Sequence, residues 1–174
     1  PHSPYSGPLN GLYDPEKLPV GPSFLKKPEG VSEFNRVRSE YFMQYLEGGD
    51  ISSDSYMQKY LAVCDEDFST EKGWKEARGN YFANITLVDN MVGDIISSLE
   101  NNNISENTIV VFTSEHGEMM GDHGLLEKRA LYEEASRVPL IFKIPWLNRD
   151  QKMIDGSISH IDLVPTLMDL IGED

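Results

Sequence analysis

An acidic residue and a histidine stand side by side in a polar segment that follows a β-branched run. The segment reads Ser114-Glu115-His116-Gly117, and Gly117 permits a turn at which the two neighbouring side chains can converge. A carboxylate and an imidazole that converge can bind a divalent metal or act on a reacting group. Taken alone, however, the pair favours a capped, charged loop over a functional site.

More titratable residues follow in the same loop. Asp122-His123-Gly124 and Glu127-Lys128-Arg129 add two carboxylates, a second histidine and two cations, in a chain whose formal net charge is -14. A solvated charged loop has the same composition, so these residues alone leave both interpretations open.

The elements before this loop indicate an α/β chain. Apolar residues recur at steps of three and four between residues 74 and 99, which predicts a helix with one apolar face that covers a sheet. Asn101-Asn102-Asn103 ends this helix. Residues 108–113 are β-branched and apolar, which is typical of a strand buried on both faces. The loop therefore leaves the carboxyl end of a strand, where open α/β sheets bind ligands.

Shorter elements complete the expected order, and residues 1–30, dense in proline and glycine, predict an extended loop. The spacing of apolar residues and the prolines indicate the rest. In order, these are two modest helices at 33–45 and 53–63, a helical turn at 132–136, a strand at 138–145, and a helix at 161–171 with Pro165 in its first turn.

Composition is that of a soluble globular protein. The chain has 174 residues, enough for one compact core, with 39% hydrophobic and 25% charged residues. Its acidic charge opposes attraction to nucleic acid and to anionic membranes, and no stretch has the length of a membrane span. The chain begins at Pro1 without methionine, so we expect its true amino terminus to be missing.

The string over residues 110–146, VVFTSEHGEMMGDHGLLEKRALYEEASRVPLIFKIPW, resembles the sulfatase family of the alkaline-phosphatase-like superfamily. The family pattern there is a strand ending in Thr-Ser-Asp-His-Gly or Asp-Asn-Gly, then Gly-Asp/Glu-His-Gly, a lysine, Tyr-Glu and Arg-Val-Pro-Leu. Residues 81–93 and 161–167 extend the likeness, and Pro1-His2-Ser3-Pro4-Tyr5 is similar to the family's Pro-His-x-Pro-Phe/Tyr element. The likeness covers nearly the whole chain.

This resemblance implies an α/β fold that is part of an alkaline-phosphatase-like sandwich. In that fold a mixed sheet is flanked by helices, and the metal site lies at the carboxyl ends of the strands. The chain would then be one partial catalytic domain, the carboxyl-terminal portion. Residues 1–30 would form an extended loop on the substrate side, and residues 74–174 the α/β portion with the metal-site loop.

The resemblance also implies a reaction, the hydrolysis of a sulfate monoester. Glu115 and His116 would bind a divalent metal, Ca²⁺ first and Mn²⁺ as the alternative, because an imidazole is a softer donor than an amide oxygen. Lys128 would contact the sulfate oxygens. His2 would contact the sulfate or its leaving oxygen from the opposite side.

Other polar residues receive supporting roles. His123 would orient the loop, and Arg129 is open between loop support and binding. His160 is interpreted as a helix-start or surface residue and Asp162 as a helix cap. Arg137 is expected to pair with an acidic residue one turn before it.

Two departures from the family pattern stand out. Glu115 replaces the usual aspartate, which moves the carboxylate by about one bond length. The family nucleophile is a formylglycine made from Cys or Ser in a Cys/Ser-x-Pro/Ala-x-Arg motif, and this chain has no such motif. Cys64, the single cysteine, lacks that context and is rejected as nucleophile. The nucleophile is therefore expected upstream, and this fragment alone is expected to be inactive.

Two other functions stay open. A phosphonate monoester or phosphodiester hydrolase of the same superfamily would share these motifs, and a non-catalytic binding module would explain the missing nucleophile. The partner under the leading hypothesis is a sulfated small molecule or a sulfated glycan. A periplasmic or secreted location is implied by the resemblance alone.

Overall fold

The structure, a computed structural model, describes residues 5–58, 66–147 and 150–173. Its longer helices confirm those expected near residues 33, 74 and 161, and the expected turn near residue 132 is the short helix α4. Residues 5–30 hold only a short 3₁₀ turn and an isolated bridge. The named elements are α1 (Glu33–Met43), α3 (Glu71–Asn101), β1 (Val110–Thr113), α4 (Glu133–Ser136), β2 (Leu140–Lys143) and α5 (Leu163–Ile171), with 3₁₀ turns η1 (Pro15–Lys17), η2 (Ile51–Ser53), η3 (Ser105–Asn107) and η4 (His160–Asp162).

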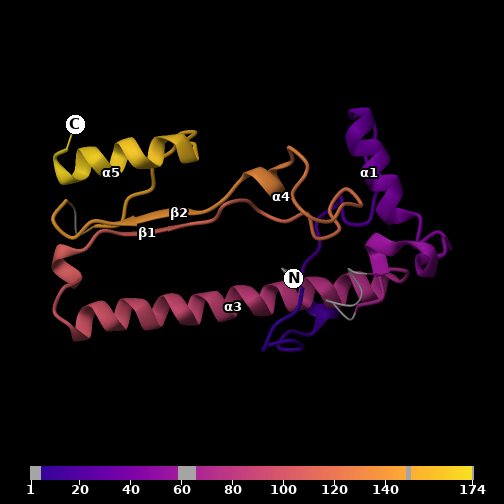
Figure 1. Cartoon of the computed structure of the whole chain (residues 1–174), viewed down its shortest axis with the longest axis horizontal. Coiled ribbons are helices and arrows are strands. Elements are labelled where there is room, and N and C mark those ends of the chain that lie inside the picture. Colours follow the sequence, from indigo (N-terminus) through magenta and orange to yellow (C-terminus); the bar gives the residue numbers. More distant parts are fainter. Residues whose placement is uncertain (1–4, 59–65, 148–149, 174) are drawn as a thin grey trace.

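Helix α3 runs along the length of the molecule (Figure 1). It begins after Thr70, whose hydroxyl accepts a hydrogen bond from the backbone N–H of Gly73 at 3.1 Å. It ends at Asn101, and Asn103 takes a left-handed conformation with φ 58° that turns the chain toward β1. The asparagine run therefore ends the helix as expected.

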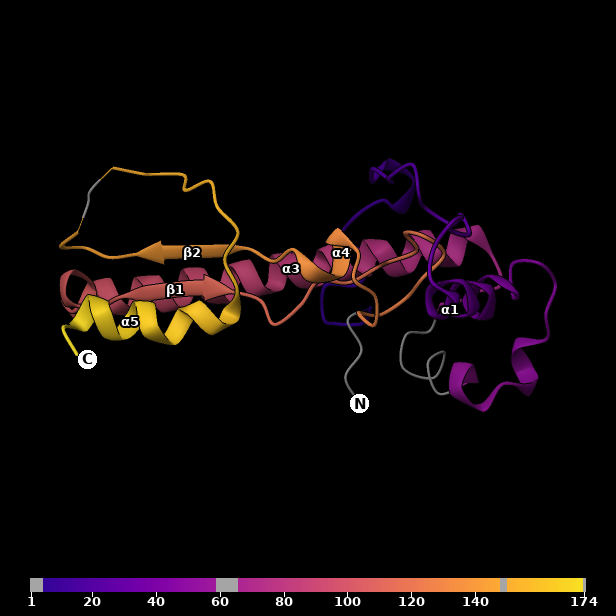
Figure 2. The same cartoon turned by 90° about the horizontal axis from the view of Figure 1, so that it is seen from above.

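The sheet consists of β1 and β2, which pair antiparallel with Val110 opposite Lys143 and Thr113 opposite Leu140. It lies between α3 and α5 (Figures 1 and 2). The prediction of a strand buried on both faces is wrong for this chain, because every residue of β1 is only half-buried. Its β-branched residues lie in a sheet whose described part has two strands, so neighbouring strands do not cover them.

The packed core lies at the opposite end of α3, where α1 and residues 114–131 meet its first turns (Figure 2). Trp74 is its largest buried side chain; its indole N–H donates to the carbonyl of Phe68 at 2.9 Å, and the two rings meet edge to face. The other large apolar side chains that are fully buried there are Phe68, Tyr5, Met57, Met119, Leu125 and Leu126.

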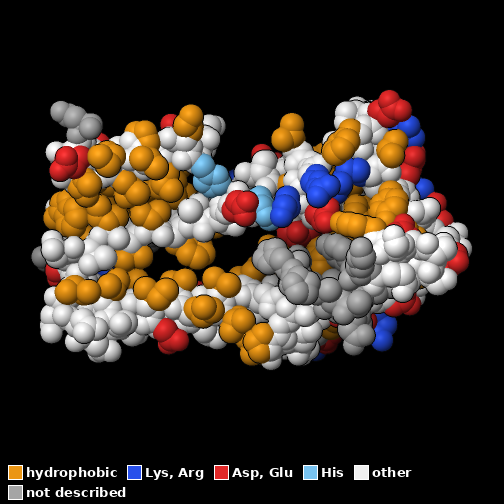
Figure 3. All heavy atoms as spheres, in the orientation of Figure 1, with side chains coloured by type: hydrophobic (Ala, Val, Ile, Leu, Met, Phe, Trp, Pro, Cys, Tyr) orange, Lys and Arg blue, Asp and Glu red, His pale blue; other side chains and the backbone are white. Residues whose placement is uncertain are grey.

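The sheet end of the molecule is open by comparison. Apolar side chains gather along the side of α3 that faces the sheet and over α5 and the sheet (Figure 3). On α3, Ile85, Val88, Met91 and Ile95 are each 48% to 58% exposed. Among the described helices, none combines the length and apolar character needed to cross a bilayer.

Candidate active-site loop

The site loop, residues 114–131, connects β1 to the turn before α4. Its first part is fixed to α4 by two backbone hydrogen bonds, from Gly117 to the carbonyl of Ala135 at 2.8 Å and from Glu118 to that of Glu134 at 2.9 Å. A Cβ atom at Gly117 would lie 1.9 Å from the carbonyl oxygen of Glu134. Glycine is therefore required for the loop to approach α4 this closely.

Glu115 and His116 converge just beyond the end of β1. The His116 Nε2 and a Glu115 carboxylate oxygen are 3.7 Å apart, and the side chains are 28% and 90% exposed, respectively. The other ring nitrogen, Nδ1, lies 2.7 Å from the carbonyl oxygen of Gly117. Because a carbonyl only accepts, this contact places a proton on Nδ1 and leaves the lone pair of a neutral imidazole on Nε2.

This pair fits a divalent cation as two of its ligands. A carboxylate oxygen and an imidazole nitrogen lie within reach of one ion, and the carbonyl on Nδ1 is the kind of outer contact that orients a metal-binding histidine. Within residues 5–58, 66–147 and 150–173, no group of three or more His, Cys, Asp or Glu side chains gathers into a metal site. Glu115 and His116 are therefore two candidate ligands, and the metal site stays a prediction.

Glu118 was not singled out from the sequence, although it follows the Glu-His-Gly step directly. Its carboxylate accepts a hydrogen bond from the Tyr5 hydroxyl at 2.5 Å. Burial raises the pKa of the Glu118 carboxyl, while the Tyr5 bond acts in the opposite direction. The bond ties the start of the described chain to the site loop.

Lys128 and Arg129 are exposed, and neither side chain makes a hydrogen bond or ion pair with another described residue. The residue before them, Glu127, has φ 68° and accepts from Arg38 at 3.2 Å and from the Tyr56 hydroxyl. No hydrogen bond or ion pair within the described residues joins Lys128 to Glu115. Acidic, histidine and basic side chains nevertheless occupy one face over the site loop (Figure 3).

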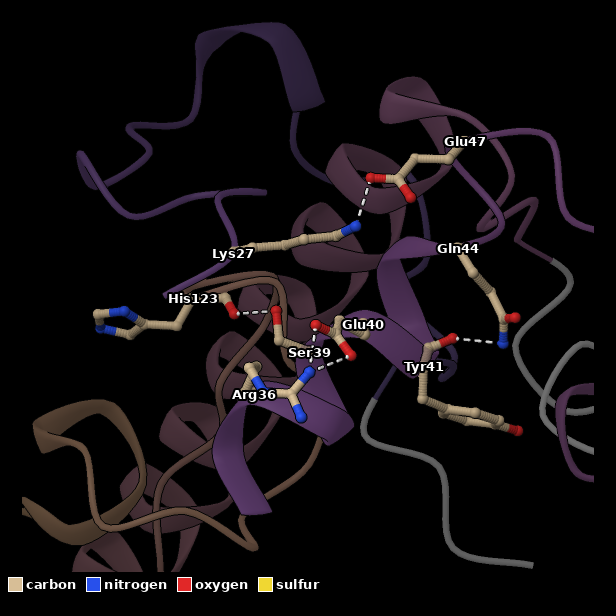
Figure 4. Close-up of polar contacts among 8 residues, drawn as sticks. All are labelled: Lys27, Arg36, Ser39, Glu40, Tyr41, Gln44, Glu47 and His123. Carbon is tan, nitrogen blue, oxygen red and sulfur yellow. Dashed lines mark hydrogen bonds and ion pairs between the residues drawn. The ribbon is translucent and has the colours of Figure 1, made fainter. Parts of the chain in front are cut away.

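His123 supports the loop through its backbone and its ring. Its N–H donates to Ser23 at 2.9 Å, and its carbonyl accepts from the buried Ser39 hydroxyl at 2.8 Å. In Figure 4 this carbonyl points to Ser39 on α1 while the imidazole points away. The ring stacks on Tyr132 with centroids 4.0 Å apart. These contacts agree with the loop-orienting role, which stays a prediction.

The structure also tests the predictions for three further residues, Arg137, Asp162 and His160. Arg137 pairs with Glu133 at 3.3 Å, one turn before it. Asp162 precedes α5 but makes no side-chain cap hydrogen bond to it; its carboxylate accepts from the backbone N–H of Ser159 at 2.8 Å, in a capping box at η4. His160 is exposed in η4, as expected, but its Nε2 also lies 2.9 Å from the carbonyl oxygen of Ser114. That contact joins residues 46 positions apart, so a local sequence pattern does not predict it. His2 and Cys64 lie outside the described residues.

Comparison with known proteins gives this loop its context. The family model described as Sulfatase matches residues 33–173. The choline-sulfatase of Rhizobium meliloti is 35% identical over 121 residues, which are 68% of this chain and 23% of that enzyme. The solved phosphonate monoester hydrolase of Silicibacter pomeroyi matches all of this chain and 32% of its own, with 27% identity and a TM-score of 0.71.

A third relative was solved with a ligand. This protein, BT4656, was determined in complex with its substrate D-glucosamine-2-N,6-O-disulfate; it matches 84% of this chain and 27% of its own, with 26% identity and a TM-score of 0.50. The chain spans about a quarter to a third of the length of these relatives. The mixed α/β fold is that of the alkaline-phosphatase-like hydrolases, and the chain belongs to the sulfatase family.

Proposed function

We propose that this chain is part of an enzyme that hydrolyses a sulfate monoester, and that it contributes Glu115, His116 and Lys128 to the site. The observation that carries the proposal is the convergence of Glu115 and His116 beyond β1, with His116 Nδ1 bound to the carbonyl of Gly117. That arrangement points one lone pair and one carboxylate outward from the strand end. Membership of the sulfatase family supports this assignment.

The site residues of this chain have three different roles in this proposal. Glu115 and His116 hold a divalent cation, Ca²⁺ first and Mn²⁺ as its rival, since a carboxylate suits both ions and an imidazole suits the softer one. When bound, such an ion withdraws charge from the ester oxygens. Lys128 binds the sulfate by charge, and His2 contacts it from the other side. The nucleophile, a formylglycine, belongs to a segment outside this chain.

Replacing Lys128 tests the proposal. In the full-length protein, Lys128→Ala should lower kcat/KM for 4-nitrophenyl sulfate on the order of 100-fold, because the anionic oxygens lose a positioned cation. Lys152→Ala is the matched control, since Lys152 is also exposed and its side chain has no ion pair within the described residues. Equal rates for the two variants would remove Lys128 from the site.

One observation favours a second candidate. The whole chain superposes on a phosphonate monoester hydrolase with a TM-score of 0.71. The full-length protein should therefore be assayed in parallel on 4-nitrophenyl sulfate and on a 4-nitrophenyl phosphonate monoester. A larger kcat/KM for the phosphonate would replace the sulfatase proposal, and no hydrolysis of either would favour a non-catalytic binding module.

A further inference from the structure

A cavity of about 320 Å³, termed the α1 cavity, lies between α1 and the end of the site loop. Its walls are mainly aromatic and aliphatic, formed by Val37, Tyr41, Phe42 and Tyr56. Its volume is at the lower end of the range for small-molecule sites, and aromatic walls of this kind offer flat faces to a ring.

Charged residues complete the lining of the cavity: Glu127 and Arg129 from the site loop, and Arg38 from α1. Glu127 and Arg38 bind each other, whereas the side chain of Arg129 makes no hydrogen bond or ion pair with another described residue. Arg129 is therefore the lining cation with its donors unused within the described part of the chain.

A second cavity, of about 350 Å³, shares Arg129 with the α1 cavity and is also lined by Lys128. The two cavities thus adjoin along the site loop, with Lys128 bordering one and Arg129 bordering both. A ligand whose reacting sulfate is held by Lys128 would extend past Arg129 to reach the α1 cavity.

Lys128 and Arg129 are the only two neighbouring cations among the described residues that both lack an ion pair with another described residue; Lys26, Lys143 and Lys152 also lack one but stand apart from each other. Acidic residues number 29 against 15 Lys and Arg, so a surface cation readily finds a carboxylate partner. Most described cations do so, for instance Lys27 with Glu47 and Arg36 with Glu40 (Figure 4). Two adjacent cations without such partners, beside two cavities, suit a ligand that carries more than one anionic group.

The wall that presents Arg129 is held in place. Glu127, at φ 68°, receives hydrogen bonds from Tyr56 and Arg38, and the Arg38 guanidinium stacks over Phe34 and Phe42 with its central carbon 5.6 and 5.7 Å from the ring centroids. These contacts hold the backbone of the site loop two residues before Arg129.

We propose that the α1 cavity binds the sugar ring of a substrate that carries a second sulfate, and that Arg129 contacts this second sulfate. The inference rests on the proposed sulfatase function and names its substrate class. A sugar with two sulfates matches the two free cations, and the relative BT4656 has a disulfated glucosamine as its substrate. Hydroxyl groups on the ring can bond the polar part of the lining, which a bare aromatic ring cannot do.

The experiment compares three probes in the full-length enzyme: D-glucosamine-2-N,6-O-disulfate, D-glucosamine 6-sulfate and 4-nitrophenyl sulfate. Sulfate release gives kcat and KM for each probe. We expect the wild type to prefer the disulfate over the 6-sulfate. Arg129→Gln should raise KM for the disulfate about tenfold and reduce that preference accordingly. Lys152→Gln, which removes the same charge elsewhere, should keep the preference.

A second variant tests the cavity without removing a charge. Val37 is exposed on α1 and borders the cavity, so Val37→Trp should fill it while the helix still forms. Its kcat/KM should fall about tenfold for both sugars and much less for 4-nitrophenyl sulfate. Glu33→Trp places the same bulk on the exposed start of α1 and is the control.

The outcomes separate the two proposals. An enzyme that releases no sulfate from any probe contradicts the sulfatase function itself. An enzyme active on 4-nitrophenyl sulfate contradicts only the sugar site if it has no preference for the disulfate, if Arg129→Gln leaves the preference intact, or if Val37→Trp behaves as Glu33→Trp does. A stronger effect of Val37→Trp on the aryl ester would assign the cavity to an aromatic ring instead.

Discussion

Gly117 shows how a single residue determines the shape of the site loop. Its backbone N–H bonds to Ala135, and a methyl group in place of its hydrogen would overlap the carbonyl oxygen of Glu134. The clash is with backbone, which a side-chain rotation cannot relieve. The loop would have to leave α4, and the Glu115–His116 pair lies directly before this contact.

We predict that Gly117→Ala lowers the free energy of unfolding by about 2 kcal/mol or more. Gly156→Ala is the control, because a Cβ atom there would meet nothing within 4 Å; its effect should stay within about 0.5 kcal/mol. Urea unfolding of the two variants measures both values. Equal stabilities would show that the loop can accommodate the methyl group.

At the residue scale, the sequence predicts the site unevenly. Glu115 and His116 are adjacent, so a following glycine sufficed to predict that they converge. The contacts of Glu118 with Tyr5 and of His160 with Ser114 join residues 113 and 46 positions apart, and one sequence contains no signal for either. The catalytic and metal-binding roles of Lys128, His2, Glu115 and His116 stay predictions.

Among the elements, α1 is fixed to the segment after it by one carboxylate. An oxygen of Asp54 accepts from the hydroxyls of Tyr41 and Tyr45, each at 2.6 Å, and its other oxygen accepts from the backbone N–H of Tyr56 at 2.8 Å. The hydrogen bonds from Tyr41 and Tyr45 are the main cause that lowers the pKa of Asp54 from 3.8 to about 2.

This shift predicts a pH dependence of stability. Because the folded pKa is depressed, the contribution of Asp54 is present above pH 3.8 and is lost as the pH falls toward 2. The difference in urea midpoint between the wild type and Asp54→Asn should therefore shrink between pH 5 and pH 2. A difference that stays constant over this range would contradict the prediction, and Asp155→Asn, on an exposed segment, is the control.

The elements themselves were largely predictable for physical reasons. Helix α3 has a long three- and four-residue repeat and an asparagine run at its end, both of which are local signals. The exposure of β1 was not predictable, because a β-branched run indicates a strand but does not show how many strands flank it. Burial of a strand is a property of the whole sheet.

At the scale of the whole molecule, the two ends differ in how they are packed. The end with α1 and the site loop has a closed core, while the sheet end exposes apolar residues on α3 and on α5, where Val164 is 66% exposed. Continuous apolar surface of this kind normally contacts another surface. The sulfatase relatives are about three times as long as this chain, which leaves room for such a surface in the full protein.

We predict that this chain, expressed alone, binds the dye ANS strongly and that the full-length protein binds it weakly. Replacing Met91 and Ile95 of α3 by serine should reduce the fluorescence of the isolated chain, whereas replacing the exposed Leu12, at the other end, should change it little. Equal ANS fluorescence of the isolated chain and the full-length protein would show that the apolar face of α3 stays open in both.

The hydrogen bonds that hold the site loop also have a consequence for the timing of folding. Tyr5 meets Glu118, Ser23 meets Asp122 and Ser39 meets His123, across 113, 99 and 84 residues of chain. Closing such long loops lowers the conformational entropy of the chain before the contacts form and stabilise it. Proteins rich in distant contacts therefore fold slowly. During synthesis Tyr5, Ser23 and Ser39 cannot make these contacts until the site loop has left the ribosome, and over that interval their segments are open to proteases and chaperones.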